Sequence, residues 1–394
     1  MIKLADKNLC TGCSLCASVC SNRCIKMETA PEGDVFPEID VGRCIKCHMC
    51  ERACPVISSP IRHLPDKAFA AWSRNESERY TSASGGIAAE LYHFALSNNY
   101  WIVGAKLEDD FSVKLKLTID ADDIELFKNS KYVYSDAGQS FIDVKEALGQ
   151  GKKVLVMGLP CQIAGFRKIF PNEDNIMLVE ILCHGTTPYI WLKKHIESIE
   201  KAKNQKATRM SFRDPAFGTK NYVFSLYNEK NECFYNATSN DGDAYQIGYH
   251  RAITYRESCY NCKFATRERV GDIVLCDFYG LGKLEPCSYC MDSVSCILTI
   301  TQKGTNFLQD AIKSEKIFIE ERPLQEAING NPRLSIPNHK NNLRKYYEKY
   351  LKVNNGDFEI TMNPIVSKYI NDIHAPKWKI RIKALFNRLK AFKG

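Results

Sequence analysis

The feature that most constrains this chain is a cysteine pattern that occurs twice near the N-terminus. Residues 10–20 and residues 44–54 both follow the spacing C-x2-C-x2-C-x3-C, and a proline follows the second copy. A short loop of this kind offers three thiolates to a 4Fe-4S cluster, and the fourth thiolate comes from the other copy. The pattern therefore predicts a first cysteine set of Cys10, Cys13, Cys16 and Cys54, and a second cysteine set of Cys44, Cys47, Cys50 and Cys20.

Two zinc knuckles are the main alternative for these loops, although zinc sites commonly use paired ligands rather than triplets closed by Cys-Pro. Cys24 lies outside the pattern, and we expect it to be a packed thiol. We expect His48, inside the second loop, to tune a redox potential from the surface rather than to bind metal.

The wider composition indicates a globular, cytoplasmic protein that uses cysteine for metal or redox chemistry. The 394 residues are 44% hydrophobic and 25% charged, and no apolar run approaches the roughly 20 residues of a membrane span. The N-terminus has no signal-peptide core, so we expect a reducing compartment, where the 18 cysteines rarely form disulfides.

Strand and helix patterns predict an α/β organisation after the cysteine-rich segment. Alternation of strands and helices begins at residue 152, which favours a parallel sheet. We expect a helix over 87–98 and helices that open at Pro160 and Pro188. We expect strands at 67–72, 100–107, 111–119, 154–157, 176–182, 209–212, 222–227, 233–236, 272–278 and 294–301.

Four cysteines of the second half can converge at one edge of this sheet. Cys161 and Cys183 each follow a strand of the β-α-β unit, whose carboxyl ends lie side by side. Cys259 and Cys262 add a close pair, so we predict a third 4Fe-4S cluster on this third cysteine set. A structural zinc site and independent buried or redox cysteines remain alternatives.

Another spacing in the same region offers a rival ligand set. This set consists of Cys287, Cys290 and Cys296, but Cys296 lies in an apolar run and is expected in the core. Cys276, outside the set, is also expected in the core as a small hydrophobic side chain.

A flavin is the ordinary converter between one-electron clusters and a two-electron organic substrate. Ser82, Ser84, Gly85 and Gly86 precede the expected helix at 87–98, and their amides could hold a phosphate. Simple helix capping is the alternative. Residues 131–134 add a lysine and two tyrosine rings.

Motifs along most of the chain make it resemble the coenzyme F420 hydrogenase/dehydrogenase beta subunit family. They follow the tandem cysteine pattern in order: Ser82-Ala-Ser-Gly-Gly86, Ser130-Lys-Tyr-Val133, Gly158-Leu-Pro-Cys-Gln-Ile-Ala-Gly165, Cys183-His-Gly185, Ser211-Phe-Arg-Asp214, Cys259-Tyr-Asn-Cys-Lys-Phe264 and Asp272-Ile-Val-Leu-Cys-Asp-Phe-Tyr-Gly280. Leu159, Cys276 and Tyr279 depart from the family pattern and leave the substrate open.

The resemblance implies an iron-sulfur flavoprotein whose FAD exchanges hydride equivalents with coenzyme F420 or another organic redox partner. It implies that the third cysteine set holds the cluster nearest the flavin, and that a redox partner protein or a small-molecule donor or acceptor is needed. By the same likeness, the residues around FAD are Ser84, Gly85, Gly86, Lys131, Tyr132, Gly158, Pro160, Gln162 and Asp277.

The expected fold is therefore α+β and α/β, with a bacterial-type ferredoxin domain, a mixed α/β flavin-binding domain and a helical C-terminal tail. A proline-rich linker after Cys54 sets the first boundary. The expected divisions are a two-cluster domain at 1–60, a flavin-binding subdomain at 66–150, an α/β oxidoreductase domain at 151–310 and a helical region at 311–394.

Most of the net charge of +8 comes from residues 376–394, which carry seven Lys or Arg and no acidic residue. A helix there has one apolar stripe, which could pack on its own domain, lie on the inner face of a membrane or bind a protein.

Two other function classes remain open: a non-catalytic ferredoxin-like electron-carrier subunit and a zinc-stabilised interaction protein. No nucleic-acid motif, P-loop or nucleophile triad is recognisable in the sequence.

Overall fold

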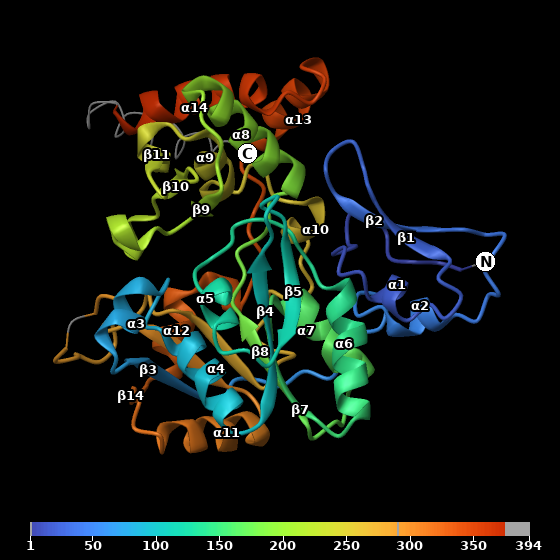
Figure 1. The fold of residues 1–394 in the computed structure, drawn as a ribbon, viewed down its shortest axis with the longest axis vertical. Helices are drawn as coiled ribbons and strands as arrows, with labels where there is room; N and C mark the ends of the chain where they lie inside the picture. The colour runs from blue at the N-terminus through green and yellow to red at the C-terminus, as the bar shows by residue number, and fades with distance from the viewer. Residues whose placement is uncertain (1, 290, 375–394) are drawn as a thin grey trace, which may run out of the picture.

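The computed structural model describes residues 2–289 and 291–374, which form three regions (Figure 1). A small N-terminal lobe projects from a central sheet that has helices on both faces, and a second lobe covers one end of that sheet (Figure 1). Among the described residues, no helix combines the length and the apolar character that a membrane crossing requires. The basic segment 376–394 lies outside the described residues.

The N-terminal lobe has the pseudo-symmetric form of a ferredoxin-like domain. It contains α1 (Leu15–Ser18), β1 (Ile25–Thr29), β2 (Val35–Ile39) and α2 (Met49–Ala53). Strands β1 and β2 pair antiparallel, and α1 contacts α2. Each helix starts inside a cysteine loop, after a residue in the left-handed region: Ser14 at φ 67° and His48 at φ 60°. Both loops thus turn at the residue after their second cysteine.

The central sheet has nine strands in the order β14-β3-β13-β12-β8-β7-β4-β5-β6. Strands β12, β8, β7 and β4 run parallel to one another, whereas β13, β3 and β14 pair antiparallel at one side and β5 pairs antiparallel with β4. The strands are β3 (Lys67–Ser73), β4 (Tyr100–Leu107), β5 (Val113–Thr118), β6 (Ser135–Asp136), β7 (Lys153–Gly158), β8 (Ile176–Ile181), β12 (Ile273–Asp277), β13 (Ser295–Thr299) and β14 (Ile317–Arg322).

Helices cover both faces of this sheet because its central strands are apolar on both sides. In β7, Leu155 and Met157 pack into the core that includes α4 and α11, whereas Val154 and Val156 pack into the core that includes α6 and α7. The helices of this region are α3 (Glu76–Thr81), α4 (Ile87–Ser97), α5 (Asp123–Phe127), α6 (Gly138–Gly149), α7 (Pro160–Ile169), α11 (Gln302–Ile312) and α12 (Leu324–Gly330).

The second lobe combines a three-stranded antiparallel sheet, in the order β11-β10-β9, with helices from two distant parts of the chain. Its core includes the buried His195, which lies between Asp243, at 3.0 Å, and Glu359, at 2.5 Å, and so links three segments. The elements are α8 (Tyr189–Lys203), β9 (Arg209–Ser211), β10 (Phe224–Tyr227), β11 (Cys233–Ala237), α9 (Ala244–His250), α13 (Arg344–Val353) and α14 (Phe358–Ile373), and α10 (Glu257–Tyr260) leads back toward the central sheet.

Long-range strand pairing connects residue ranges that the expected divisions separate. Residues 66–150 and 151–310 share one sheet, because β4 pairs with β7 and β3 pairs with β13. The region 311–394 is divided, since β14 joins the central sheet whereas α13 and α14 join the second lobe. Sequence periodicity identifies a strand but not its hydrogen-bonding neighbour, which explains both differences.

A buried ion pair fixes the segment that leads from Cys262 into β12. Glu180 and Arg269 are fully buried, with Arg269 Nε 3.0 Å from Glu180 Oε2. The other oxygen of Glu180 accepts hydrogen bonds from the Val270 and Gly271 amides, both at 2.7 Å. Arg269 also donates to the Phe264 and Thr266 carbonyls.

We predict that Glu180→Ala lowers the free energy of unfolding by about 3–5 kcal/mol, because it leaves a buried guanidinium without its counter-charge. Equilibrium denaturation in urea measures this change. Glu321→Ala is the control, since its partner Lys67 is exposed and such pairs contribute about 0–1 kcal/mol. Equal losses in the two variants would show that burial of the Glu180 pair has no special effect.

Candidate functional site

The first cysteine set surrounds one small cavity in the N-terminal lobe. All four thiols line it, together with Leu15 and Val56. Burial, with smaller contributions from the nearby Cys54 and Cys10 thiols, raises the pKa of Cys13 to about 11. The cysteines that the sequence assigned to one cluster, from both copies of the pattern, are therefore neighbours in space.

The second cysteine set surrounds a separate cavity at the outer end of the same lobe. Cys24 also lines this cavity, and its Sγ lies 3.3 Å from that of Cys20. Contact with Cys20 raises the pKa of Cys24 to about 11, with a further contribution from Cys44. Cys24 is buried, as expected for a packed thiol, but it packs directly against a predicted ligand.

The third cysteine set converges at the carboxyl edge of β7 and β8, as the β-α-β order suggested. Cys161 lies in the first turn of α7, Cys183 follows β8, and Cys259 and Cys262 come from α10 and the residues after it. All four line one cavity. Burial raises the pKa of Cys161 well above its usual value, and Cys262, Cys183, Cys13 and Cys259 add to this effect.

Across residues 2–289 and 291–374, no three His, Cys, Asp or Glu side chains are close enough together to bind a single metal ion. A zinc ion needs its four ligands around one centre, whereas the thiolates of a 4Fe-4S cluster each bind a different iron. In the rival set, Cys296 is fully buried in β13, and Cys290 lies outside the described residues.

A larger cavity of about 350 Å³ opens at the carboxyl ends of β7, β8 and β12. Its size lies within the range of small-molecule sites. Seven of the nine residues that the resemblance assigned to FAD line it: Ser84, Gly86, Lys131, Tyr132, Gly158, Gln162 and Asp277.

The other two assigned residues lie behind the cavity wall. The amide of Gly85 donates to Ser295 Oγ at 2.9 Å, and a Cβ on Gly85 would lie 2.6 Å from the Ala71 carbonyl oxygen, so this residue must pack closely on the sheet. Pro160 lines the cavity of the third cysteine set instead.

Several assigned side chains already have protein partners. Gln162 accepts from the Leu159 amide at 2.9 Å and donates to Ser135 Oγ at 2.9 Å, which fixes the start of α7. Lys131 Nζ donates to three carbonyls at the end of α5, and burial lowers its pKa to about 7. Gln162 and Lys131 therefore shape the cavity indirectly, through their hydrogen bonds to the backbone around it.

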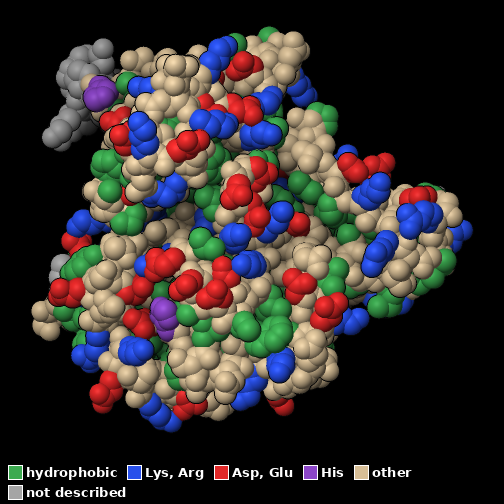
Figure 2. All heavy atoms as spheres, viewed as in Figure 1, with side chains coloured by type: hydrophobic (Ala, Val, Ile, Leu, Met, Phe, Trp, Pro, Cys, Tyr) green, Lys and Arg blue, Asp and Glu red, His purple; other side chains and the backbone are tan. Residues whose placement is uncertain are grey.

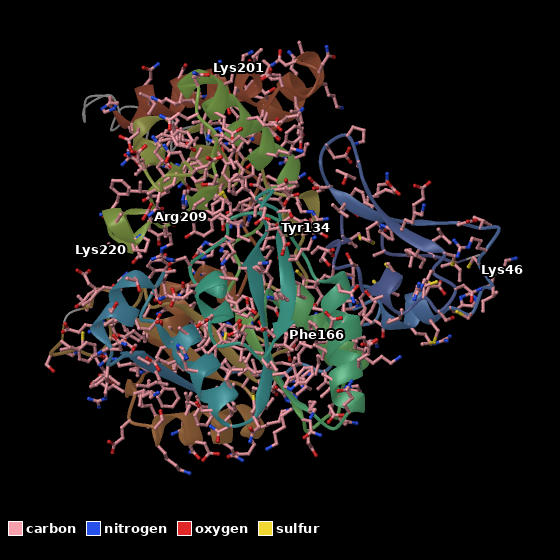
Figure 3. All side chains as sticks on the ribbon, in the orientation of Figure 1. Lys46, Tyr134, Phe166, Lys201, Arg209 and Lys220 are labelled. Atoms are coloured by element: carbon pink, nitrogen blue, oxygen red, sulfur yellow. The ribbon has the colours of Figure 1, made fainter. Side chains whose placement is uncertain are left out.

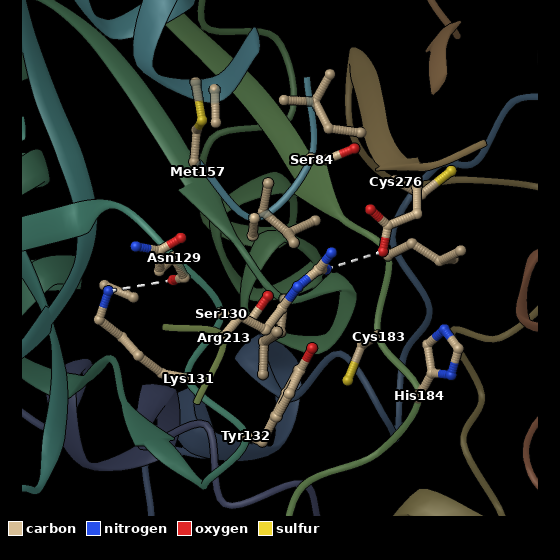
Figure 4. A pocket seen from close by; sticks show the side chains of 18 of the residues that line it. Ser84, Asn129, Ser130, Lys131, Tyr132, Met157, Cys183, His184, Arg213 and Cys276 are labelled. Atoms are coloured by element: carbon tan, nitrogen blue, oxygen red, sulfur yellow. Dashed lines mark hydrogen bonds and ion pairs between the residues drawn. The ribbon is translucent and has the colours of Figure 1, made fainter. Parts of the chain in front are cut away.

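Aromatic and basic side chains that the sequence did not single out complete the cavity (Figure 4). Tyr132 stacks on Tyr249 with ring centroids 4.4 Å apart. Arg213 forms an ion pair with Asp277 at 3.1 Å and lies over the ring of Tyr222. Arg213 was within a recognised motif, but its partner lies 64 residues away, so only the fold could show the pair.

The start of α4 is the most suitable place in this cavity for a phosphate. Gly86 precedes the helix at φ 80°, a conformation that glycine adopts without strain. Lys128, which also lines the cavity, forms an ion pair with Glu78 at 3.1 Å. The Ser84 hydroxyl donates to the Val294 carbonyl at 3.1 Å, so it holds this turn against β13. Because Lys128 is already paired with a carboxylate, the amides at the start of α4 are the groups that fit an anion here.

Three of the four cavities are arranged in series through shared walls, and the cavity of the second cysteine set lies in the same lobe as the first without a shared lining residue. Thr11 and Cys13 line the cavities of both the first and the third cysteine sets. Residues 182–186, which include Cys183, line both the cavity of the third set and the large cavity. Cys183 therefore belongs to the third set and to the wall of the large cavity at once.

Arg256 lies at the junction between the N-terminal lobe and the third cysteine set. It is buried, donates to the carbonyls of Thr11 and Val35, and lies 3.4 Å from Asp34 Oδ1. Its guanidinium is 4.7 Å from the centre of the Tyr134 ring. The positive charge of Arg256 lowers the pKa of Cys10 in the first set and of Cys259 in the third set, against the larger opposite effect of burial.

Comparison with known proteins matches two separate regions of the chain. Residues 9–57 match the 4Fe-4S dicluster domain, and residues 151–325 match the C terminus of the coenzyme F420 hydrogenase/dehydrogenase beta subunit. A curated relative, the coenzyme F420-dependent sulfite reductase of Methanocaldococcus jannaschii, is 26% identical over 174 residues, which are 42% of this chain and 26% of the relative. The match thus spans about a quarter of that relative's length.

A chain of the F420-reducing [NiFe] hydrogenase complex from Methanosarcina barkeri aligns with 75% of this chain and 90% of its own length, at 19% identity and a TM-score of 0.44. The two matched regions contain all three cysteine sets. Residues 151–325 of the chain are thus similar to the C terminus of the coenzyme F420 hydrogenase/dehydrogenase beta subunit, and residues 9–57 are similar to a 4Fe-4S dicluster domain.

Proposed function

We propose that this protein is an iron-sulfur flavoprotein that carries electrons between an external redox partner and an organic substrate. The family and the dicluster domain support an iron-sulfur oxidoreductase. The three cysteine sets would each hold a 4Fe-4S cluster, and the large cavity would hold FAD. When bound, the clusters transfer single electrons and the flavin converts them to hydride equivalents.

The serial arrangement of three cavities, those of the first and third cysteine sets and the large cavity, is the observation that carries this proposal. Shared walls at Cys13 and Cys183 connect the first set to the third and the third set to the large cavity. An electron-carrying chain needs such short separations, whereas independent buried cysteines or structural zinc sites do not.

The side chains and amides that line the large cavity offer the chemistry that would hold a flavin. Tyr132 and Tyr249 offer stacked aromatic surface, and the start of α4 offers amides to a phosphate. The pKa of His250 is lowered to about 4 by burial, with help from His184 and Arg213, so this ring is neutral near pH 7. The organic substrate would be coenzyme F420, on which the sulfite reductase relative depends, or a related two-electron carrier.

We predict that the anaerobically reconstituted protein binds about twelve irons per chain, and that Cys183→Ser binds about eight. Iron and acid-labile sulfide analysis measures both. Cys233→Ser is the matched control, because Cys233 is exposed and belongs to none of the three sets. About eight irons in the unmodified protein would contradict a third cluster.

A second prediction distinguishes the ligand Cys20 from its neighbour Cys24. Cys20→Ala should lose about four irons, because the pattern uses Cys20 to complete the second set, whereas Cys24→Ala should keep its full iron content. Iron analysis and electron paramagnetic resonance of the reduced protein measure the outcome. The reverse result would assign the ligand role to Cys24, the thiol 3.3 Å away.

We predict that Ala83→Trp lowers FAD affinity at least about tenfold, a loss of about 1.4 kcal/mol, because the indole fills part of the large cavity. Flavin released on denaturation is quantified against iron, which should not change. Tyr80→Trp is the control, since Tyr80 is exposed on the adjoining α3. If the unmodified protein releases no flavin on denaturation, the flavoprotein assignment is overturned. Addition of reduced coenzyme F420 to the holoprotein tests the identity of the substrate.

A further inference from the structure

We propose that the outer face of the N-terminal lobe docks a small acidic electron-carrier protein. This inference rests on the proposed function, because it identifies where electrons enter or leave the second cysteine set. We call this surface the distal face and define it by three cations and three apolar side chains: Arg23, Arg43, Lys46, Val41, Ile45 and Met49.

The second set is the only one of the three with an exposed cysteine among the described residues. Cys47 is exposed, whereas the other members of the sets are buried or half-buried. Ile45 and Met49 line the cavity of this set and are also 65% and 45% exposed. A carrier that covers this face therefore approaches the second set through one layer of side chains.

The exposed apolar side chains of the distal face are unusual for a segment of this length. Val41 is 75% exposed, and residues 40–49 are exposed at every position except Cys44. Apolar groups that surround a redox centre can desolvate against a partner, which is the arrangement at the centre of many protein interfaces. Scattered apolar residues would need no explanation, but these adjoin one metal-ligand loop.

The cations of the distal face indicate the charge of the partner. Arg23, Arg43 and Lys46 are exposed, and none forms an ion pair with another residue in the described part of the chain. The nearby carboxylates are engaged locally: Asp40 accepts from the Gly42 amide at 3.0 Å, and Glu51 bonds to His48 and the Lys3 amide. Unpaired positive charge around an apolar centre complements an acidic surface.

The position of the distal face leaves it open to a partner. Figure 3 places Lys46 at the outer end of the projecting lobe, far from Lys201 on the second lobe. Figure 2 shows several Lys and Arg side chains and a few acidic ones on the visible face of this lobe, with apolar side chains along its lower edge. Weak electron-transfer complexes bury less than about 1,200 Å² in total, which a lobe of this size can supply.

The test uses the reconstituted holoprotein and a small acidic two-cluster ferredoxin as the probe. Arg23→Glu combined with Lys46→Glu should weaken binding about tenfold or more at low ionic strength, measured by isothermal titration calorimetry. The rate constant for electron exchange with the reduced ferredoxin, measured by stopped flow, should fall in parallel. Both effects should shrink as salt is added.

These substitutions should leave the metal loops intact. Arg23 and Lys46 already hold left-handed backbone at φ 47° and φ 56° with a side chain present, so Glu adds no new backbone strain. Lys201→Glu combined with Lys230→Glu is the matched control, since it makes the same charge change on exposed residues of the second lobe. Iron content and reduction by dithionite, which needs no docking face, should be equal in all three proteins.

Each outcome decides the proposal. The proposal is overturned if the distal-face variant and the control variant bind the ferredoxin equally well. It is also overturned if the rate constant for electron exchange does not depend on salt. Docking of anionic phospholipid vesicles through Arg23 and Lys46, without ferredoxin binding, assigns the face to a membrane instead. If the chain self-associates and these substitutions abolish that self-association, the distal face binds a second copy of the chain instead. Failure of dithionite to reduce the flavin would contradict the proposed function itself, and so is distinguishable from failure of the docking face.

Discussion

The cavity of the third cysteine set depends on how the polypeptide returns to the sheet edge after α10. Glu180, at the end of β8, holds this return segment through Arg269 and the Val270 and Gly271 amides, with no exposure to solvent. A charged pair in such a place is costly to bury unless its hydrogen bonds are complete, and here they are nearly so. The pair thereby keeps the Cys259–Cys262 loop beside Cys183.

Arg256 performs a comparable task for the N-terminal lobe. Its guanidinium reaches the Thr11 and Val35 carbonyls of the lobe, while its backbone amide binds the Thr186 carbonyl beside the third cysteine set. Ser14 and Ser18 add hydrogen bonds to Asp136 and Gly138 at the start of α6. The lobe is therefore fixed in orientation, and Cys13 faces the third set rather than solvent. A loosely tethered carrier domain would show few such buried polar contacts.

The same organisation explains why the two ends of the series differ in character. At the inner end, Tyr132, Tyr249 and Arg213 form a partly enclosed cavity in which charges are paired or suppressed by burial. At the outer end, the second cysteine set lies under exposed cations and aliphatic side chains. A small organic substrate suits the first environment, and a protein carrier suits the second.

The sequence by itself determined the two cysteine loops, most strands and three of the helices of the described residues, because spacing and periodicity depend on neighbours along the chain. The β-α-β order also predicted the convergence of Cys161 with Cys183, because the carboxyl ends of adjacent parallel strands lie side by side. Only the tertiary structure decided that β4 pairs with β7, that Cys24 touches Cys20, and that Arg213 meets Asp277. These contacts join residues through packing and strand order, and a pattern of local spacing carries no information about which distant segment lies alongside.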